Sequence, residues 1–375
     1  MNEQEAISKV VNIDIFIISR DIYSLNLIKT DTFIFYIISW LNMDVRRVQI
    51  TGGSSFMITL PKDWANSVGL KKNDTVAIRV QSDGALSLYP KGTIPAPKRS
   101  TRIIDATDIK DHEFFFRQLV GAYIAGHTTI LIKSAHPMPD GIISAAKRFV
   151  QTSVGLEMIE ANETQMLIAN LIEHDAIDTK KIIERMGLLA KSMILDLYEA
   201  ASTGDFKNIT DMGARDVEVD RIYWMISRQY NIYQRDISAP HKMGISLYEM
   251  TACLFLSRVL EAIGDHAVMM SEHLIALGEN SKEFNTNNNM HNLGREVTEL
   301  LTKTVKSWVN KDIILSEQSI KNADEIIRNA NRTASAIKTT EVVPTPIYDA
   351  MLFSSSRMAE YCKSIAEFAF NLEME

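Results

Sequence analysis

The sequence predicts a multidomain α+β protein with three parts: a small β module, a small α/β domain and an all-α region at the C-terminal end. First, 375 residues are long for one core, because domains usually contain about 100–200 residues. Second, apolar and polar residues alternate in short runs between positions 45 and 90, as in β-strands. Third, from position 178 onward the apolar residues recur every three to four positions, as in helices.

The first 42 residues do not fit this organisation. They contain two apolar runs, each too short to span a membrane and each interrupted or flanked by charged residues. A secretory signal would have a basic start and an unbroken apolar centre, and neither is present. A self-contained β module begins after Met43, so residues 1–42 are either an N-terminal extension or the product of an upstream start-codon assignment. We predict no membrane span and a cytoplasmic location.

The two cysteines, Cys253 and Cys362, favour the same compartment. They lie in helical patterns and lack the spacing of a zinc or redox motif. We therefore expect buried structural thiols in a reducing environment.

The basic module, residues 43–99, contains nine basic and four acidic residues in a chain of net charge −7. This asymmetry suggests a polyanionic partner. In order, we predict two strands, a short helix opened by Pro61 and two further strands, at 45–51, 56–60, 61–70, 75–81 and 85–90. About 50 residues of short strands bury little surface alone, so a partner subunit is expected.

The stretch RRVQITGGSSFMITLPKDWANSVGLKKNDTVAIRVQSDGALSLYPK resembles the AbrB-like swapped-hairpin DNA-binding domains. The resemblance implies a homodimer in which two chains interleave into one small β barrel with a basic face toward DNA. Carried over position by position, the DNA contacts would be Arg46, Arg47, Thr51, Ser54, Ser55 and Lys62. The same cations could instead be solubilising charges on a dimeric barrel. Some AbrB-like proteins mainly bind protein, so the fold alone does not establish DNA binding.

Residues 100–170 follow a Pro-rich linker and predict a small α/β linker domain, because strand patterns alternate with helical ones. No catalytic constellation is apparent in it. Its histidines, His112, His127 and His136, are isolated in the sequence, which favours structural or surface positions. We predict a role as a spacer or in dimerisation.

The helical region predicts six long segments, at 178–202, 205–234, 240–278, 289–310, 312–338 and 345–374. SRVLEAIGDHAVMMSEHL (257–274) and SRMAEYCKSIAEFAFNL (356–372) align without a gap, which suggests an internal duplication. We therefore predict a pair of three-helix bundles, repeat one at 171–280 and repeat two at 281–375.

Repeat one carries two like-charged pairs. Glu261 and Asp265 are four residues apart in an apolar helical run, and such a pair costs a few tenths of a kcal/mol. A solvated helix face is one interpretation. The other rests on a resemblance: EAIGDHA (261–267), together with Asp216 and Asp220 on the preceding helix, is similar to the PhoU family. That resemblance implies one metal site.

Its ligands would be the four carboxylates of Asp216, Asp220, Glu261 and Asp265. Hard oxygen ligands suit iron, manganese, zinc or magnesium, and a bound cation would offset the repulsion between the acids. His266 and His273 would either support such a site or simply pack. Opposite Glu261 and Asp265, repeat two has Glu360 and Ser364, and its second helix has no acidic pair four residues apart, so we predict one intact site per chain.

The motifs also bear on the class of function. No Glu has a His three positions later, as di-iron bundles require, and nucleophile, P-loop and dinucleotide motifs are absent, so we predict no enzyme. The two resemblances imply a phosphate-responsive, DNA-binding transcriptional regulator that exerts negative control on phosphate uptake and contacts a phosphate transporter or sensor protein. The alternative is a metal-binding accessory protein that docks on the transporter or sensor without binding DNA. A metallohydrolase is a third, weaker alternative.

Overall fold

The computed structural model divides the chain into two compact units, Met1–Ala96 and Pro97–Glu375. It describes residues 46–51, 55–80, 84, 86–90, 100–172, 178–235, 239, 243–278, 288–337 and 346–374. The N-terminal extension, residues 1–42, lies outside the described residues. The finer division of the chain at residues 99, 170 and 280 stays a prediction.

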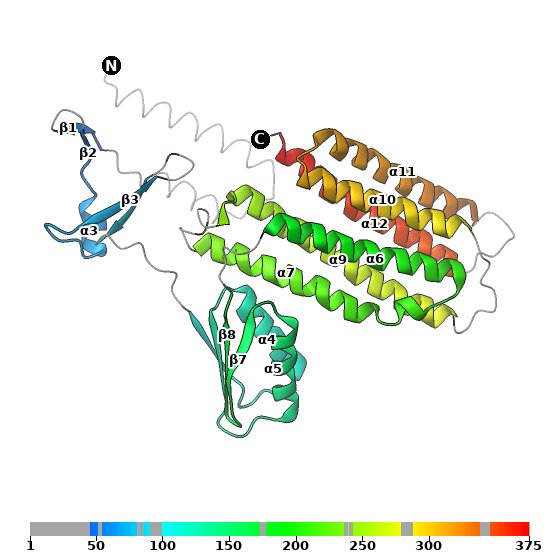
Figure 1. Cartoon of the computed structure of the whole chain (residues 1–375), viewed down its shortest axis with the longest axis horizontal. Helices are drawn as coiled ribbons and strands as arrows, with labels where there is room; N and C mark the ends of the chain where they lie inside the picture. Colours follow the sequence, from blue (N-terminus) through cyan, green and yellow to red (C-terminus); the bar gives the residue numbers. More distant parts are fainter. Residues whose placement is uncertain are drawn as a thin grey trace, which may run out of the picture. The chain divides into compact units, whose positions relative to one another are not determined.

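The N-terminal unit contains two separate antiparallel hairpins on either side of a short helix (Figure 1). The elements are β1 (Gln49–Thr51), β2 (Ser55–Met57), α3 (Lys62–Ser67), β3 (Val76–Val80) and β4 (Leu86–Pro90). This is the order of strands and helix that the alternation predicts. No barrel is closed by the described residues of a single chain, because β1–β2 and β3–β4 form two different sheets.

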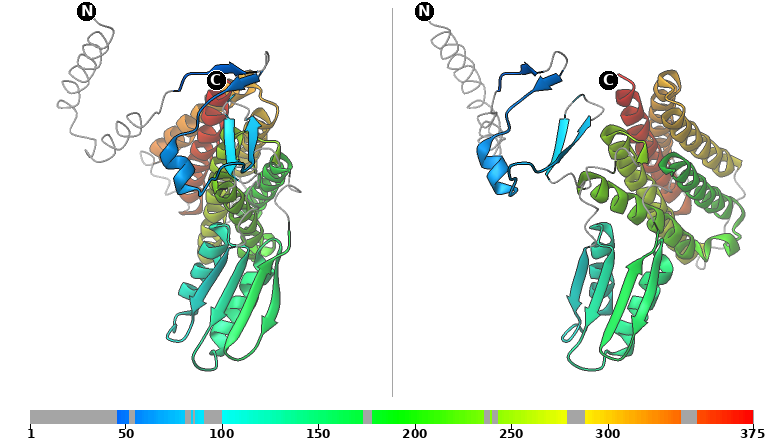
Figure 2. Two further views of the ribbon diagram at one scale, coloured as in Figure 1. Left: turned by 90° about the vertical axis from the view of Figure 1, so that its left-hand side faces the viewer. Right: turned by 60° about the vertical axis from the view of Figure 1, so that its left-hand side comes forward.

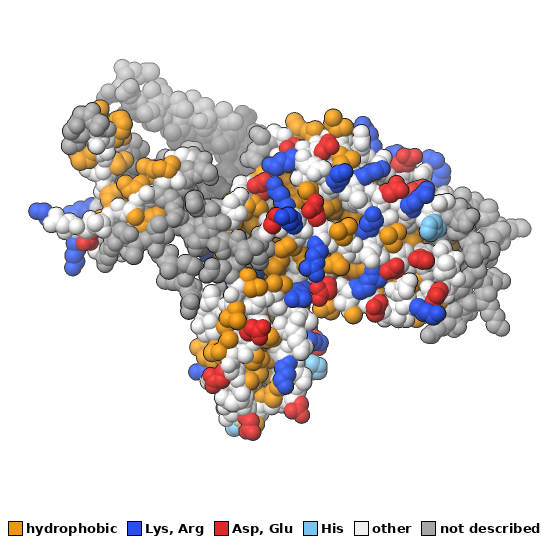
Figure 3. Space-filling view, in the orientation of Figure 1, with side chains coloured by type: hydrophobic (Ala, Val, Ile, Leu, Met, Phe, Trp, Pro, Cys, Tyr) orange, Lys and Arg blue, Asp and Glu red, His pale blue; other side chains and the backbone are white. Residues whose placement is uncertain are grey.

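Both hairpins expose large apolar side chains. Phe56 is 78% exposed, Val80 70% and Ile50 69%, whereas Tyr89 is the one buried hydrophobic residue in the described part of this unit. Figure 3 shows hydrophobic side chains gathered on this unit. Apolar surface of this kind normally marks an interaction site.

The C-terminal unit begins with an α/β domain. Its elements are β5 (Thr101–Asp105), α4 (His112–Ile124), β6 (Thr129–Lys133), α5 (Asp140–Thr152), β7 (Leu156–Ala161) and β8 (Gln165–Asn170). The sheet order is β5-β6-β8-β7, with β5 parallel to β6 and the other pairs antiparallel. Helices α4 and α5 cover one face of this sheet (Figures 1 and 2). Between them lies a core that includes Phe115, Leu119 and Phe149.

Strand β5 ends at Asp105, earlier than its apolar pattern suggests. The carboxylate of Asp105 accepts hydrogen bonds from the backbone N–H of Thr107, at 3.0 Å, and from its hydroxyl, at 2.5 Å. Such a local side-chain turn competes with the strand ladder and ends it.

Six long helices follow among the described residues: α6 (Thr179–Thr203), α7 (Met212–Arg235), α9 (Leu247–Gly278), α10 (Asn288–Val309), α11 (Ile313–Ile337) and α12 (Pro346–Leu372). Helices α6, α7 and α9 contact one another, as do α10, α11 and α12, and the pairs α6–α10 and α9–α12 join the two groups. One apolar core contains buried residues from all six helices. The helical C-terminal region is thus confirmed, and its division into a pair of three-helix bundles stays a prediction.

Two of these helices begin later than the periodicity predicts. Before α7, Gly204 adopts a left-handed φ of 76° and ends α6, and a 3₁₀ turn, η2 (Lys207–Ile209), follows. At the start of α9, Ser246 Oγ accepts a hydrogen bond from Glu249 N–H, while the Glu249 carboxylate accepts one from Ser246 N–H. This reciprocal capping box fixes the first residue of α9 at Leu247.

Among the described helices, none is both long enough and apolar enough to cross a membrane.

Candidate functional site

The predicted metal ligands lie on two helices that pack against each other, Asp216 and Asp220 on α7 and Glu261 and Asp265 on α9. Gly264 sets how closely the Asp216 carboxylate can approach α9. A Cβ atom at position 264 would lie 2.5 Å from Asp216 Oδ1 and 3.4 Å from Val219 Cγ1. The missing side chain therefore leaves room for Asp216 beside Asp265, where any other residue would displace it.

Three of the four carboxylates repel one another. Burial raises the pKa of Asp216 to about 7, and the charges of Asp220 and Asp265 contribute to the rise. Burial also raises the pKa of Asp220 to about 6, with a contribution from Asp265 and an opposing one from Arg258. The Oδ1 atom of Asp216 is buried and has no hydrogen-bond partner among the described residues. Among the described residues, Arg258 thus offsets the charge of these acids only in part, and a buried charge is costly unless a partner is supplied.

Glu261 has a different environment. It is 8% exposed, and its carboxylate forms an ion pair with Arg258 one turn earlier on the same helix. As the side chains lie, no group of three or more His, Cys, Asp or Glu residues in the described ranges is arranged so that it could hold a metal ion. The four-carboxylate site stays a prediction, with three aspartates brought together and Glu261 held by Arg258.

Repeat two contains a built-in cation where repeat one has a glycine. In the ungapped alignment of the two repeats, Lys363 occupies the position of Gly264. Its ammonium group lies 2.8 Å from Asp324 Oδ1 on α11 and 3.8 Å from Glu367 Oε1. In place of Asp265 stands Ser364, whose hydroxyl donates to a backbone carbonyl. In repeat two, the acid on the second helix, Asp324, thus has an ammonium group as its partner. In repeat one, Oδ1 of Asp216 has none among the described residues. The spacing of the acidic residues in the sequence did not indicate this difference.

The nearby histidine and the thiols have structural roles. His266 is 7% exposed, and its Nε2 lies 3.1 Å from Ser354 Oγ on α12, so it joins α9 to α12. Burial, helped by the charge of Arg357, lowers its pKa to about 4, which keeps the ring neutral. Cys253 and Cys362 are buried free thiols whose pKa values burial raises to about 12. His273 is exposed.

Of the predicted DNA contacts, the side chains of Arg46, Arg47, Ser55 and Lys62 are exposed. Thr51 is the last residue of β1, and Ser54 lies outside the described residues. Their role in DNA binding stays a prediction.

Sequence reasoning missed a set of cationic side chains in the C-terminal unit. Arg228 and Arg235 on α7 donate hydrogen bonds to backbone carbonyls at the end of α4, close to His127. His127 appears isolated in the sequence, because the residues near it in space lie about 100 positions later in the chain. No local motif could have indicated this cluster.

Comparison with protein families identifies two known domains. The PhoU domain family matches residues 183–274. The family described as antidote-toxin recognition MazE, bacterial antitoxin, matches residues 49–96. The first match covers α7 and most of α6 and α9, and thus all four acidic residues.

Curated relatives match the helical region. A phosphate-specific transport system accessory protein PhoU homolog from Caulobacter vibrioides is 34% identical over 99 residues, 26% of this chain and 40% of that protein. A protein of the same description from Borreliella burgdorferi is 27% identical over 213 residues, 54% of this chain and 87% of that protein. The match thus spans less than half the length of the Caulobacter relative.

Among solved structures, the crystal structure of PhoU from Pseudomonas aeruginosa is similar with a TM-score of 0.45 and 18% identity. The alignment covers 53% of this chain and 96% of that one. The two family matches show that the chain contains a PhoU domain in its helical region and, nearer its N-terminus, a MazE/AbrB-like antitoxin domain.

Proposed function

We propose that this protein is a dimeric, cytoplasmic regulator of phosphate uptake that binds DNA through its N-terminal unit and a metal ion through its PhoU domain. The observation that carries the proposal is the presence of both domains in one chain. The relatives named as accessory proteins of a phosphate-specific transport system support a regulatory role rather than an enzymatic one. A phosphate transporter or sensor protein is the expected protein partner.

The proposed metal ligands are Asp216, Asp220, Glu261 and Asp265. The buried, unpartnered Oδ1 of Asp216 and the raised pKa values of Asp216 and Asp220 support a cation there. The contrast with Lys363 supports it further, because repeat two supplies an ammonium group at the aligned position. Binding through all four acids requires side-chain rotation, above all of Glu261 away from Arg258.

Iron, manganese, zinc or magnesium would suit this oxygen-only set of ligands. The ion would supply positive charge that cancels the repulsion between α7 and α9. Asp216 and Asp220 would then hold one helix, and Glu261 and Asp265 the other, in a fixed position for a protein partner.

The exposed apolar side chains of the N-terminal unit support dimerisation through an interleaved barrel. Phe56, Ile50 and Val80 are each more than two-thirds exposed in the single chain, and a second copy would cover them. The basic side chains of Arg46 and Arg47 precede β1, where they would face the phosphates of DNA.

A mobility-shift assay with the protein's own upstream DNA, at several salt concentrations, tests DNA binding. We expect binding that weakens steeply with salt, and a double substitution Arg46→Ala/Arg47→Ala that lowers both the affinity and the salt dependence. Lys71→Ala/Lys72→Ala is the matched control, because it removes the same charge from the turn before β3. No measurable binding at low salt would refute a DNA-binding regulator.

A second candidate function would survive that result. The matched MazE family is described by its recognition of a toxin, which is a protein partner. This description favours an accessory protein whose N-terminal unit dimerises or binds protein while the PhoU domain docks on the transporter or sensor.

A further inference from the structure

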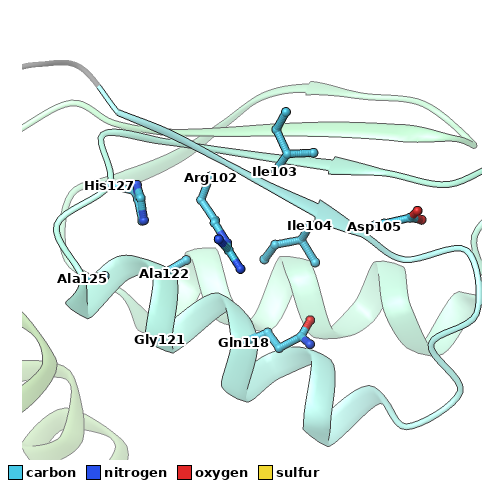
Figure 4. Close-up of a pocket in the computed structure, with 9 residues that line it drawn as sticks. All are labelled: Arg102, Ile103, Ile104, Asp105, Gln118, Gly121, Ala122, Ala125 and His127. Carbon is cyan, nitrogen blue, oxygen red and sulfur yellow. The ribbon is translucent and has the colours of Figure 1, made fainter.

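A cavity of about 460 Å³ lies in the α/β domain between the edge strand β5 and helix α4 (Figure 4). Its lining includes Arg102, Ile104, Gln118, Gly121, Ala122 and His127. The volume is within the range of about 300–1,000 Å³ that is usual for small-molecule sites. Nothing in the proposed function uses this cavity.

Two cationic or protonatable side chains point into the cavity at one end. Arg102 extends from β5 toward α4, and the imidazole of His127 points into the same space from the loop after α4 (Figure 4). Among the described residues, no carboxylate forms an ion pair with Arg102. His127 Nδ1 lies 3.1 Å from Ser100 Oγ, which leaves its Nε2 for a ligand.

Two more guanidinium groups lie behind this end. Arg228 is 2% exposed and donates from Nη1 to the carbonyls of Tyr123, at 2.7 Å, and His127, at 2.8 Å. Arg235 donates to the carbonyl of Ala125 at 2.7 Å. These bonds neutralise the negative end of α4, and within the described ranges neither arginine is paired with a carboxylate.

The positive charge of these groups acts on His127. Burial lowers the pKa of His127, and the charges of Arg102, Arg235 and Arg228 lower it further. One acid, Asp105, also lines the cavity, but its carboxylate accepts the two hydrogen bonds from Thr107 and lies at the opposite end (Figure 4). The end formed by Arg102 and His127 is therefore electropositive and suits an anion.

The remaining walls fit the body of a small molecule. Gly121 has no side chain and Ala122 has only a methyl group, so α4 leaves space there for a ligand. A Cβ atom at position 121 would meet no atom within 4 Å. Ile104 supplies an apolar wall from β5. The Oε1 atom of Gln118 is buried without a hydrogen-bond partner among the described residues, and it can accept from a ligand hydroxyl or amino group.

We propose that this cavity binds a small organic anion. Its phosphate or carboxylate group lies against Arg102 and His127, and its apolar body lies against Ile104, Gly121 and Ala122. This site is separate from the acidic residues of the PhoU domain and from the proposed DNA-binding face.

Isothermal titration calorimetry of the full chain tests the proposal with three probes: adenosine 5′-monophosphate, benzoate and uncharged adenosine. We expect one or both anions to bind and adenosine not to bind. Binding of the nucleotide alone identifies a phosphate group as the anchor, and binding of benzoate alone identifies a carboxylate.

Two substitutions locate the binding. Arg102→Gln is expected to weaken it by about tenfold, and Gly121→Leu, whose Cβ atom meets open space, is expected to abolish it by filling the cavity. Arg117→Gln is the control, because it removes a charge from the exposed side of the same helix. Thermal melting of each variant checks the fold. The proposal is overturned if neither anion binds up to about 10 mM, if adenosine binds as well as the nucleotide, or if Gly121→Leu binds like the wild type.

Discussion

Replacing Asp216 with asparagine should stabilise the metal-free protein at neutral and alkaline pH. A pKa raised from 3.8 to about 7 means that ionising this carboxyl costs the folded state about 4 kcal/mol, at about 1.36 kcal/mol per pKa unit. Asparagine has almost the same shape and carries no charge. We expect Asp216→Asn to raise the free energy of unfolding by about 2–4 kcal/mol at pH 8.

The sign of the pH dependence follows from the proton count. Between pH 3.8 and about 7 the folded state keeps the proton on Asp216 while the unfolded chain has released it. Stability from this group is therefore fully present below pH 3.8, falls as the pH rises to about 7 and is constant above. The variant lacks this part of the slope, so its advantage over the wild type should grow from pH 4 to pH 7.

Urea denaturation in the presence of EDTA, at pH 5 and pH 8, measures this advantage. Adding manganese should then stabilise the wild type more than the variant, because the ion compensates the charge that asparagine lacks. Glu325→Gln, an exposed acid on α11, is the control for the loss of one negative charge. A variant that is less stable than the wild type at pH 8, or an advantage that does not change with pH, would refute the reasoning.

Three further predictions concern other residues. Gly264→Lys places an ammonium group where repeat two has Lys363, and its Cβ atom displaces the Asp216 carboxylate, so the variant should lose the response of its melting temperature to manganese. An unchanged response would contradict the proposed site. Phe56→Glu should convert the proposed dimer into monomers in light scattering after size exclusion, because a charge replaces a side chain that the second copy is expected to cover. A variant that remains dimeric would place the dimer interface elsewhere. Arg228→Ala should lower the free energy of unfolding, measured by urea denaturation, by about 3 kcal/mol, since the carbonyls of Tyr123 and His127 lose their donor inside the protein. A decrease of less than about 1 kcal/mol would show that water replaces the guanidinium group.

The helices and strands were predictable because their signals are local. The three-to-four-residue spacing of buried side chains such as Ile183, Met186 and Ala190 identifies α6 without knowledge of its neighbours. The residue at which a helix begins depends instead on individual hydrogen bonds, such as the reciprocal pair between Ser246 and Glu249. Periodicity alone does not predict these bonds.

The candidate site was predictable in part. Spacing placed Asp216 and Asp220 on one helix and Glu261 and Asp265 on the next, and family resemblance implied their common purpose. Neither the spacing nor the resemblance indicated that Glu261 pairs with Arg258 or that Gly264 makes room for Asp216, since both depend on the positions of individual side chains. The cavity beside Arg102 and His127 could not be predicted either, because its surroundings are far apart in the sequence: Arg228 bonds to Tyr123 across 105 positions.

Helix α7 carries Asp216 and Asp220 in its first half and Arg228 and Arg235 in its second. It thus joins the proposed cation site, which faces α9, to the α/β domain, where its arginines donate hydrogen bonds to the end of α4. A rotation or axial shift of this helix would move both ends together, so binding at the proposed cation site would change the affinity of the proposed anion site, and thermodynamic reciprocity would make the two effects equal. One 24-residue helix would in this way connect two ligands of opposite charge.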